Sequence, residues 1–161
     1  MKINDVDWSN WTPEQTATLM FVIDDNSVLL IQKKRGLGAG KINGPGGRLE
    51  EGETPYDCAI RETQEEVCIT PGSVEAHGEL RFHAEDMPTI HVYVFVAHGF
   101  EGTPAETDEA IPLWFDFNQI PYDEMWDDDL LWLPAVLAGK SVQGWFSFRD
   151  ETLLDYRLEL T

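Results

Sequence analysis

Residues 36–68 read GLGAGKINGPGGRLEEGETPYDCAIRETQEEVC, and this stretch decides how the fold is interpreted. Its first half, residues 36–52, holds seven of the thirteen glycines in the chain. A typical helix start follows, because Thr54 can serve as N-cap, Pro55 suits the first helical position and Asp57 favours the first turn. The sequence therefore predicts a glycine-rich loop that runs directly into a helix.

The predicted helix has one apolar side and ends at Thr70-Pro-Gly. The residues expected to face the core recur at helical spacing, and they are Tyr56, Ala59, Ile60, Thr63 and Val67. Cys58 and Cys68 lie ten residues apart along it, or roughly 15 Å, which is too far for a disulfide. We therefore expect two free thiols.

Three carboxylates share another face of this helix. Glu62, Glu65 and Glu66 stand at i, i+3 and i+4. Like charges at this spacing destabilise a helix by about 0.2–0.5 kcal/mol per pair. One interpretation is a solvated acidic face, which is common in an acidic protein. The other is a site for Mg²⁺ or Mn²⁺, because hard cations prefer oxygen ligands.

Neighbouring residues favour the metal interpretation. Arg61 lies four residues before Glu65 and eight after Glu53, so an ion pair between Glu53 and Arg61 would hold the loop against the helix. Glycine also lets the backbone approach a ligand closely and offers amide groups to anions. So many glycines joined to an acidic helix exceed what tight turns require.

Positive charge gathers around the same loop. Five of the eleven Lys and Arg residues lie there: Lys33, Lys34, Arg35, Lys41 and Arg48. They either balance a local acidic patch or contact phosphate, and we favour phosphate contact.

The composition excludes other classes of protein. The chain has 161 residues and a formal net charge of −19, which disfavours binding to a nucleic acid polymer. The N-terminus lacks the layout of a signal peptide, and no apolar run reaches the ~18 residues that span a bilayer. We expect a cytoplasmic protein that does not contact a membrane.

Strands outnumber helices in the remaining sequence. Apolar runs predict strands at residues 16–23, 28–32, 74–83, 89–97, 111–117, 142–148 and 153–160. A second helix is expected at 127–138, although Pro134 lies inside it. This pattern indicates one α+β domain over residues 1–161, with a mixed β-sheet sandwiched between helices (α/β/α). Residues 1–15 form an N-terminal arm, and its Trp8 and Trp11 suggest that part of it docks.

The loop and helix resemble the motif of the Nudix family of phosphoanhydride hydrolases. The residues in register with that motif are Gly47, Glu53, Arg61, Glu62, Glu65, Glu66 and Ile69. Two positions depart from it: Thr63 replaces an aliphatic residue, and Cys68 replaces a glycine that would end the helix. The resemblance implies a Nudix fold and a divalent metal, Mg²⁺ or Mn²⁺.

From about residue 17 onward the chain also resembles the MutT group of this family, which hydrolyses oxidized purine nucleoside triphosphates such as 8-oxo-dGTP. The resemblance implies metal ligands at Glu62, Glu65, Glu66 and Glu109, with a main-chain carbonyl at Gly46 or Gly47. It implies catalytic roles for Glu53, Arg61, Glu65 and Glu66, with Glu65 or Glu66 helping to activate water. It implies substrate contacts by Lys33 to phosphate, by Asn43, Asp128 and Asp129 to the base, by stacking of Trp126, and by Phe82 and Trp132 lining the pocket.

The residues after Trp126 allow two interpretations. An aromatic face beside paired carboxylates suits a purine that presents N–H donors, whereas a run of aspartates also stabilises a helix N-terminus. Two positions depart from the MutT group, because Leu37 and Ala84 stand where aromatic residues are expected. The loop at 84–88 is also shorter. These differences bear on which base is preferred.

These residues and the resemblance leave three possible functions to be tested. The first is conversion of modified purine nucleoside triphosphates to monophosphate and pyrophosphate by a monomeric enzyme that cleanses the nucleotide pool. The alternative is a Nudix pyrophosphohydrolase for another substrate, such as an NDP-sugar or a general nucleotide. The third is a nucleotide-sensing module without catalysis, against which the complete set of acidic residues argues.

Overall fold

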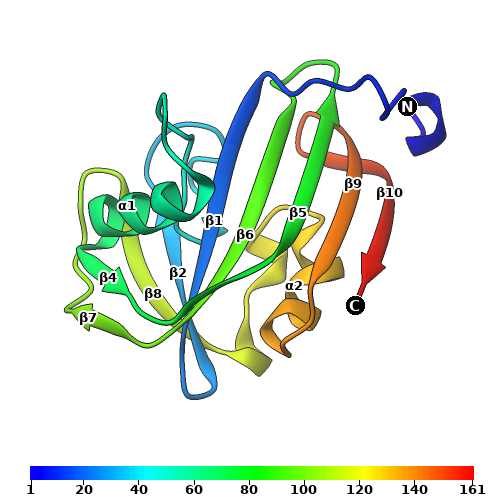
Figure 1. Cartoon of the computed structure of the whole chain (residues 1–161). Helices are drawn as coiled ribbons and strands as arrows, with labels where there is room; N and C mark the ends of the chain where they lie inside the picture. Colours follow the sequence, from blue (N-terminus) through cyan, green and yellow to red (C-terminus); the bar gives the residue numbers. More distant parts are fainter.

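The structure is a computed structural model that describes residues 1–161, and it contains a mixed sheet between two helices (Figure 1). The helices are α1 (Pro55–Val67) and α2 (Asp129–Leu137). The strands are β1 (Gln15–Asp24), β2 (Ser27–Lys33), β3 (Ile42–Asn43), β4 (Ile69–Pro71), β5 (Val74–Ala84), β6 (Ile90–His98), β7 (Phe100–Gly102), β8 (Ala110–Asp116), β9 (Val142–Arg149) and β10 (Thr152–Leu160). Short 3₁₀ helices are η1 (Ile3–Asp5), η2 (Phe117–Gln119) and η3 (Tyr122–Glu124).

The main sheet has the order β10-β9-β5-β6-β1-β2-β3, and β8 also pairs with β2. Two of the pairings are parallel, β1 with β6 and β5 with β9, and the others are antiparallel. A separate two-stranded sheet joins β4 to β7. The expected α+β class, with a mixed sheet between helices, is confirmed.

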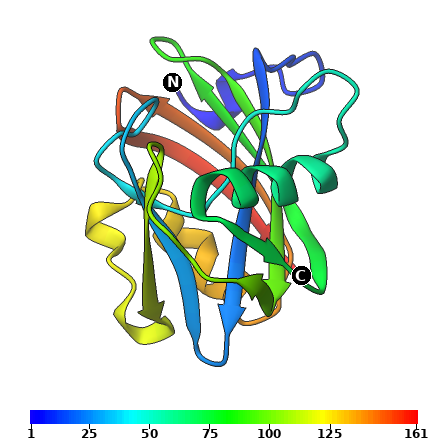
Figure 2. The same ribbon diagram turned by 90° about the vertical axis from the view of Figure 1, so that its left-hand side faces the viewer.

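Both faces of the central strands are buried, which explains why they read as continuous apolar runs. Met20 and Val22 of β1 belong to a core of ten buried residues on the side of α1. Phe21 points the other way, into a core of seventeen buried residues that includes Trp132 of α2. Figure 2 shows α1 in front of the sheet and α2 on the far side.

Helix α1 begins where the sequence predicts. The Thr54 hydroxyl accepts a hydrogen bond from the Asp57 amide at 3.1 Å, and Pro55 takes the first helical position. The helix ends at Val67, because Cys68 adopts the left-handed conformation with φ of 67°. A glycine would adopt this conformation at lower cost, by roughly 1 kcal/mol.

The prediction is wrong for one residue of the apolar side of α1, Tyr56. Tyr56 is exposed, and its ring meets that of Phe95 on the central strand β6, with ring centroids 6.2 Å apart. Cys58 is fully buried instead, because the glycine loop covers that side of the helix. Thr63 fits in place of an aliphatic residue, since it is fully buried and its hydroxyl donates to the Ala59 carbonyl.

The remaining element predictions hold with small shifts in their ends. Helix α2 starts two residues later than expected and continues through Pro134. The short strands β3, β4 and β7 were not predicted, because two or three residues carry no periodicity. Both cysteines are free, as expected. None of the helices has the length and apolar character that crossing a membrane requires.

The N-terminal arm docks on the end of the sheet formed by β9 and β10 (Figure 1). Ile3 is buried, and its amide donates to the Asp155 carboxylate at 2.8 Å. The Trp8 indole donates to the Ile3 carbonyl at 3.0 Å. The arm is therefore packed against the domain, as its two tryptophans indicated.

Candidate active site

Two adjacent glycines bring the loop into contact with its neighbours. A Cβ atom at Gly46 would lie 1.9 Å from the Thr18 carbonyl oxygen, and a Cβ atom at Gly47 would lie 2.4 Å from the Glu62 carboxyl carbon. Real side chains do not tolerate such distances. Glycine is required at both positions so that the backbone can lie against β1 and against the acidic face of α1.

Arg61 ties the loop to the helix. Its guanidinium forms a two-pronged ion pair with Glu53, at 2.6 Å and 2.8 Å, which confirms the pairing predicted from spacing. It also donates to Glu62 at 2.8 Å and to the Arg48 carbonyl at 3.2 Å. The hydrogen bond from Arg61 lowers the pKa of Glu53 to about 2, so this carboxylate stays ionised. We infer that the pair orients Glu62 and the loop.

Glu62, Glu66 and Glu109 form a cluster of carboxylates. One oxygen of each lies within 4.8 Å of the others. Glu66 is only 4% exposed. Burial, reinforced by the charges of Glu62 and Glu109, raises its pKa to about 8. Burial likewise raises the pKa of Glu62. Such crowding is unfavourable without a cation, so the donor set fits a hard divalent metal.

Backbone and hydroxyl contacts fix the cluster. The Gly46 amide donates to the Glu66 carboxylate at 3.1 Å. The Thr107 hydroxyl donates to the Glu66 carbonyl at 2.7 Å and accepts from the Glu109 amide at 3.3 Å. A residue between β7 and β8 thereby brings Glu109 to the end of α1. Sequence spacing alone could not have placed Glu109 there.

Glu65 lies apart from the cluster. It is exposed, and its carboxylate accepts a hydrogen bond from Arg61 at 3.2 Å. Its role as a metal ligand or as a base that activates water remains a prediction from the family resemblance.

A cavity of about 420 Å³ adjoins this acidic cluster. Its size suits a small organic ligand. Glu66, Gly46 and Gly47 form one end of it, and Trp126, Asp128 and Asp129 form the other. The remaining predicted substrate residues Lys33, Asn43 and Phe82 also line it, as do Leu37 and Ala84.

Two buried aspartates stand at the far end of the cavity. Asp128 accepts a hydrogen bond from the Trp132 indole at 2.8 Å, and burial raises its pKa to about 6. Burial and the neighbouring Asp128 raise the pKa of Asp129 well above its usual value. One oxygen of Asp129 is buried without any hydrogen-bond partner. A buried polar atom left unpaired is costly, so this oxygen is poised for a ligand.

The expectation that Trp132 lines the pocket needs correction. Trp132 is fully buried and is not part of the cavity surface. Its ring packs against Phe21 in the core, with centroids 5.8 Å apart. Trp132 lies on the side of α2 that faces the sheet. It reaches the cavity only indirectly, through its hydrogen bond to Asp128.

Trp126 is held on two sides. A Cβ atom at Gly38 would lie 2.9 Å from the Trp126 indole nitrogen, so the glycine loop packs closely against the indole. The Lys41 ammonium lies 5.2 Å from the ring centroid. Phe148 meets the ring edge to face at 5.9 Å. Trp126 is thus a fixed aromatic wall.

The five basic residues near the loop divide into two groups. Lys34, Arg35 and Lys41 pair with Glu106, Glu109 and Glu151, so the charge-balancing interpretation fits them. Lys33 and Arg48 have no carboxylate partner, and both line the cavity. The phosphate interpretation is therefore best supported for Lys33 and Arg48.

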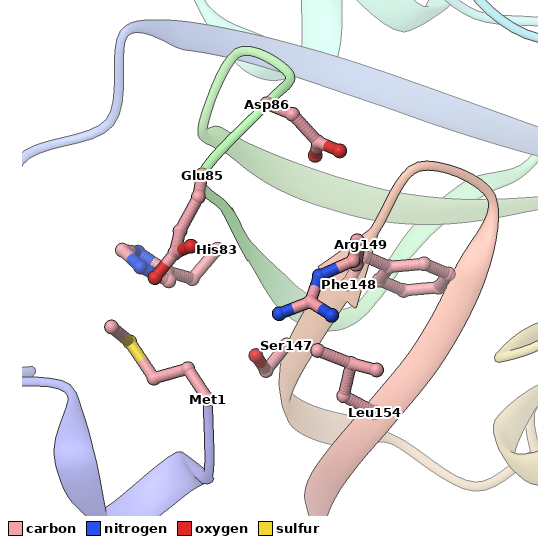
Figure 3. Close-up of a pocket in the computed structure, with 8 residues that line it drawn as sticks. All are labelled: Met1, His83, Glu85, Asp86, Ser147, Phe148, Arg149 and Leu154. Carbon is pink, nitrogen blue, oxygen red and sulfur yellow. The ribbon is translucent and has the colours of Figure 1, made fainter.

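Sequence reasoning missed seven apolar lining residues, which are Ala17, Leu19, Ile31, Met87, Ile90, Val92 and Phe148. Strand alternation offered a signal for Phe148, because Phe146 and Phe148 share one face of β9 and Phe146 stacks on Phe82 at 5.1 Å. A second, smaller cavity of about 110 Å³ lies on the other side of Phe148, between Met1 of the arm, the end of β5 and the β9–β10 hairpin (Figure 3).

The fold and the site together define a class of protein, in which a glycine-rich loop leads into an acidic helix beside a cavity that is large enough for a small organic ligand. Comparison with known proteins agrees. Residues 13–136 match the NUDIX domain, and the chain belongs to the Nudix family. Hydrolases of this family generally use a divalent metal.

Individual members of the family are similar to this chain over most of its length. The chain is 40% identical over 144 residues to the oxidized purine nucleoside triphosphate hydrolase of Danio rerio, covering 88% of this chain and 92% of that protein. It is 41% identical over 143 residues to the Mus musculus protein of the same name, with the same coverage. Among solved structures, a MutT protein from Bacillus halodurans superposes with a TM-score of 0.81 at 29% identity, covering 90% of this chain and 97% of that one.

Proposed function

We propose that this chain hydrolyses oxidized or otherwise modified purine nucleoside triphosphates, such as 8-oxo-dGTP, to the monophosphate and pyrophosphate. The observation that carries this proposal is the pair Asp128 and Asp129, buried beside Trp126 in a cavity whose other end is the carboxylate cluster. The names of the two animal relatives support it. We further propose that the protein acts as a cytoplasmic monomer.

The base would bind between Trp126 and the aspartates. Because burial raises the pKa of both aspartates, one of them can stay protonated near neutral pH. A protonated carboxyl donates a hydrogen bond while its ionised neighbour accepts one. The pair can therefore recognise a purine edge that carries both an N–H donor and a carbonyl acceptor, and Asn43 adds a third polar group to the same wall.

The phosphates would extend from the base toward the carboxylates. Lys33 and Arg48 provide positive charge along this path. The amides of the glycine loop offer further donors.

Mg²⁺ is the proposed metal, with Mn²⁺ as a substitute. Glu62, Glu66 and Glu109 would hold it, together with the Gly46 or Gly47 carbonyl, and Glu65 is proposed to assist. The bound cation would lower the pKa of a water molecule and polarise the phosphate. Glu65 or Glu66 would accept the proton of the attacking water, and Arg61 with Glu53 would keep these carboxylates in place.

A substrate panel tests the proposal. Purified protein with Mg²⁺ should release pyrophosphate from 8-oxo-dGTP well above its rate with dGTP. Because Leu37 and Ala84 alter the cavity wall, the panel should include methylated purines and 2-hydroxyadenine nucleotides. Equal or absent turnover of 8-oxo-dGTP and dGTP would sink this specificity, and release of a sugar phosphate from an NDP-sugar would favour the alternative substrate class.

A further inference from the structure

The turn of the β9–β10 hairpin, residues 149–153, contacts three walls of the large cavity. These walls come from distant parts of the chain: the glycine loop, the β5–β6 loop and the segment that carries Trp126. Each of them reaches the turn through one polar side chain. Nothing in the proposed chemistry requires the hairpin turn, so these contacts call for an explanation of their own.

The first contact is made by Asp127. Its carboxylate accepts a hydrogen bond from the Leu153 amide at 3.0 Å. Strand β10 is the edge of the sheet, so one side of its backbone has no partner strand and is open to a side chain. Asp127 stands between Trp126 and Asp128, and it points away from the cavity that both of them line.

Leu153, which donates this hydrogen bond, is connected to the aromatic side of the cavity. Leu153 is paired with Phe148 across the hairpin, just before a register shift in β10. Phe148 packs against the Trp126 ring. Asp127 is therefore bonded to Leu153, Leu153 is paired with Phe148, and Phe148 packs on Trp126, the residue next to Asp127. This closed set of contacts supports Trp126 on the side away from the cavity.

The other two contacts reach the same turn. Both oxygens of Asp86 accept from the Asp150 amide, at 3.2 Å and 3.1 Å, and Figure 3 shows Asp86 on the β5–β6 loop close to the hairpin. Lys41 of the glycine loop pairs with Glu151 at 3.3 Å while its ammonium lies over Trp126. The hairpin turn therefore links all three walls.

We propose that Asp127 is a positioning residue for the base-binding wall, and that it acts through the β9–β10 turn. This inference rests on the proposed function, since it assumes that Trp126 and Asp128 contact a base. Its role would be to hold the backbone on which those two side chains stand. The competing explanation is that Asp127 only stabilises the start of α2 by its negative charge, because it lies two residues before that helix.

Two substitutions separate these explanations. Asp127→Asn removes the charge but keeps an oxygen that accepts from the Leu153 amide. Asp127→Ala removes both. If Asp127 positions the wall, the asparagine variant should retain wild-type behaviour and the alanine variant should lose it. If charge is what matters, the two variants should be equally impaired. Asp123→Ala is the matched control, since Asp123 is an exposed acid nearby without a hydrogen bond to the hairpin.

Steady-state kinetics with 8-oxo-dGTP give the first readout. We expect Asp127→Ala to raise KM roughly threefold to tenfold with kcat nearly unchanged, the scale of one hydrogen bond to a charged group discounted for exposure. Asp127→Asn and Asp123→Ala should match the wild type. An unchanged KM in Asp127→Ala, or an asparagine variant as impaired as the alanine variant, would overturn the proposal.

Hydrogen exchange of the protein without substrate gives a second readout. In Asp127→Ala the amide of Leu153 and those of residues 126–129 should exchange faster, whereas Asp127→Asn should protect them as the wild type does. This measurement does not depend on the substrate. A wild type that hydrolyses no modified purine triphosphate refutes the proposed function alone, while unchanged exchange in Asp127→Ala refutes the positioning role.

Discussion

The two ends of the site are built in opposite ways. The carboxylate end draws most of its groups from residues 46–66, one loop and one helix in direct succession. The base end draws on the glycine loop, β5, the segment before α2 and β9, which lie far apart in the sequence. Only Glu109 at the first end is brought in from a distance.

This difference bears on what can change. At the carboxylate end, Glu62 lies against Gly47 and accepts a hydrogen bond from Arg61, so replacing any of the three disturbs its neighbours. At the base end, Leu37 and Ala84 line the wall without a polar role, and each can vary alone. The carboxylate end, which would determine the phosphoanhydride bond that is hydrolysed, is therefore a rigid local unit. The base end, which would determine the preferred base, is built from residues that can change independently.

The largest expected effect is at the carboxylate end. Glu66→Gln keeps the shape of the side chain but removes a charge from the cluster. We expect kcat with 8-oxo-dGTP and Mg²⁺ to fall by about a thousandfold, the scale of losing one group that stabilises the reacting charge. Steady-state rates of pyrophosphate release measure this. Undiminished activity would contradict the assignment of Glu66.

The next effect is at the base end. Asp129→Ala should lower kcat/KM for 8-oxo-dGTP by about a hundredfold, because it leaves Asp128 without the second carboxyl that can donate to the base while Asp128 accepts. Affinity for Mg²⁺, measured by calorimetry, should stay at the wild-type value. Trp132→Phe is a useful companion, since it removes the hydrogen bond to Asp128 while keeping an aromatic ring in the core. Loss of metal affinity in Asp129→Ala would contradict the division of the site into two ends.

Sequence alone was informative where the site is local. Helical spacing predicted the shared face of Glu62 and Glu66, and an eight-residue separation predicted the ion pair between Glu53 and Arg61. The positions of the longer strands along the chain, and a sheet sandwiched between helices, followed from the apolar runs. These features depend on neighbours within two or three turns of chain, which the sequence displays directly.

Tertiary contacts were beyond its reach. Trp132 and Trp126 stand six residues apart and look alike in sequence, yet one is buried in the core and the other lines the cavity. Asp127 is indistinguishable from Asp128 and Asp129 by composition, yet it turns outward to the hairpin. Which way each side chain faces depends on where α2 starts, and helix ends are the least certain part of any pattern.

A smaller effect tests the support of the carboxylate end. Arg61→Lys keeps the positive charge but loses the two-pronged pairing with Glu53. We expect Mg²⁺ affinity to weaken by roughly tenfold to a hundredfold, as is usual when the groups that orient metal ligands are changed. Calorimetric titration measures it. Thermal unfolding serves as the check on folding, and an unaltered affinity would show that Arg61 has no orienting role.

The smallest expected effect is on the pH dependence of stability, which should differ between the two ends. Burial raises the pKa of Glu66 to about 8 and that of Asp128 to about 6 in the folded, metal-free protein. A carboxyl whose pKa is raised on folding binds more protons in the folded state, so the free energy of unfolding falls as pH rises from about 4 to about 8. Both ends contribute to this fall, and only the carboxylate end is relieved by a cation.

We therefore expect the melting temperature of the metal-free protein to drop between pH 6 and pH 8 by roughly 5 °C more than that of Glu66→Gln. Excess Mg²⁺ should remove most of this difference, because a cation stabilises the ionised form of Glu66. A smaller fall with pH should persist in Glu66→Gln, with or without Mg²⁺, because the raised pKa values of Asp128 and Asp129 at the base end also contribute to it. Identical melting curves for the wild type and Glu66→Gln across pH 6–8 would show that Glu66 is ionised without strain, and that the carboxylate end does not need its cation in the way the geometry indicates.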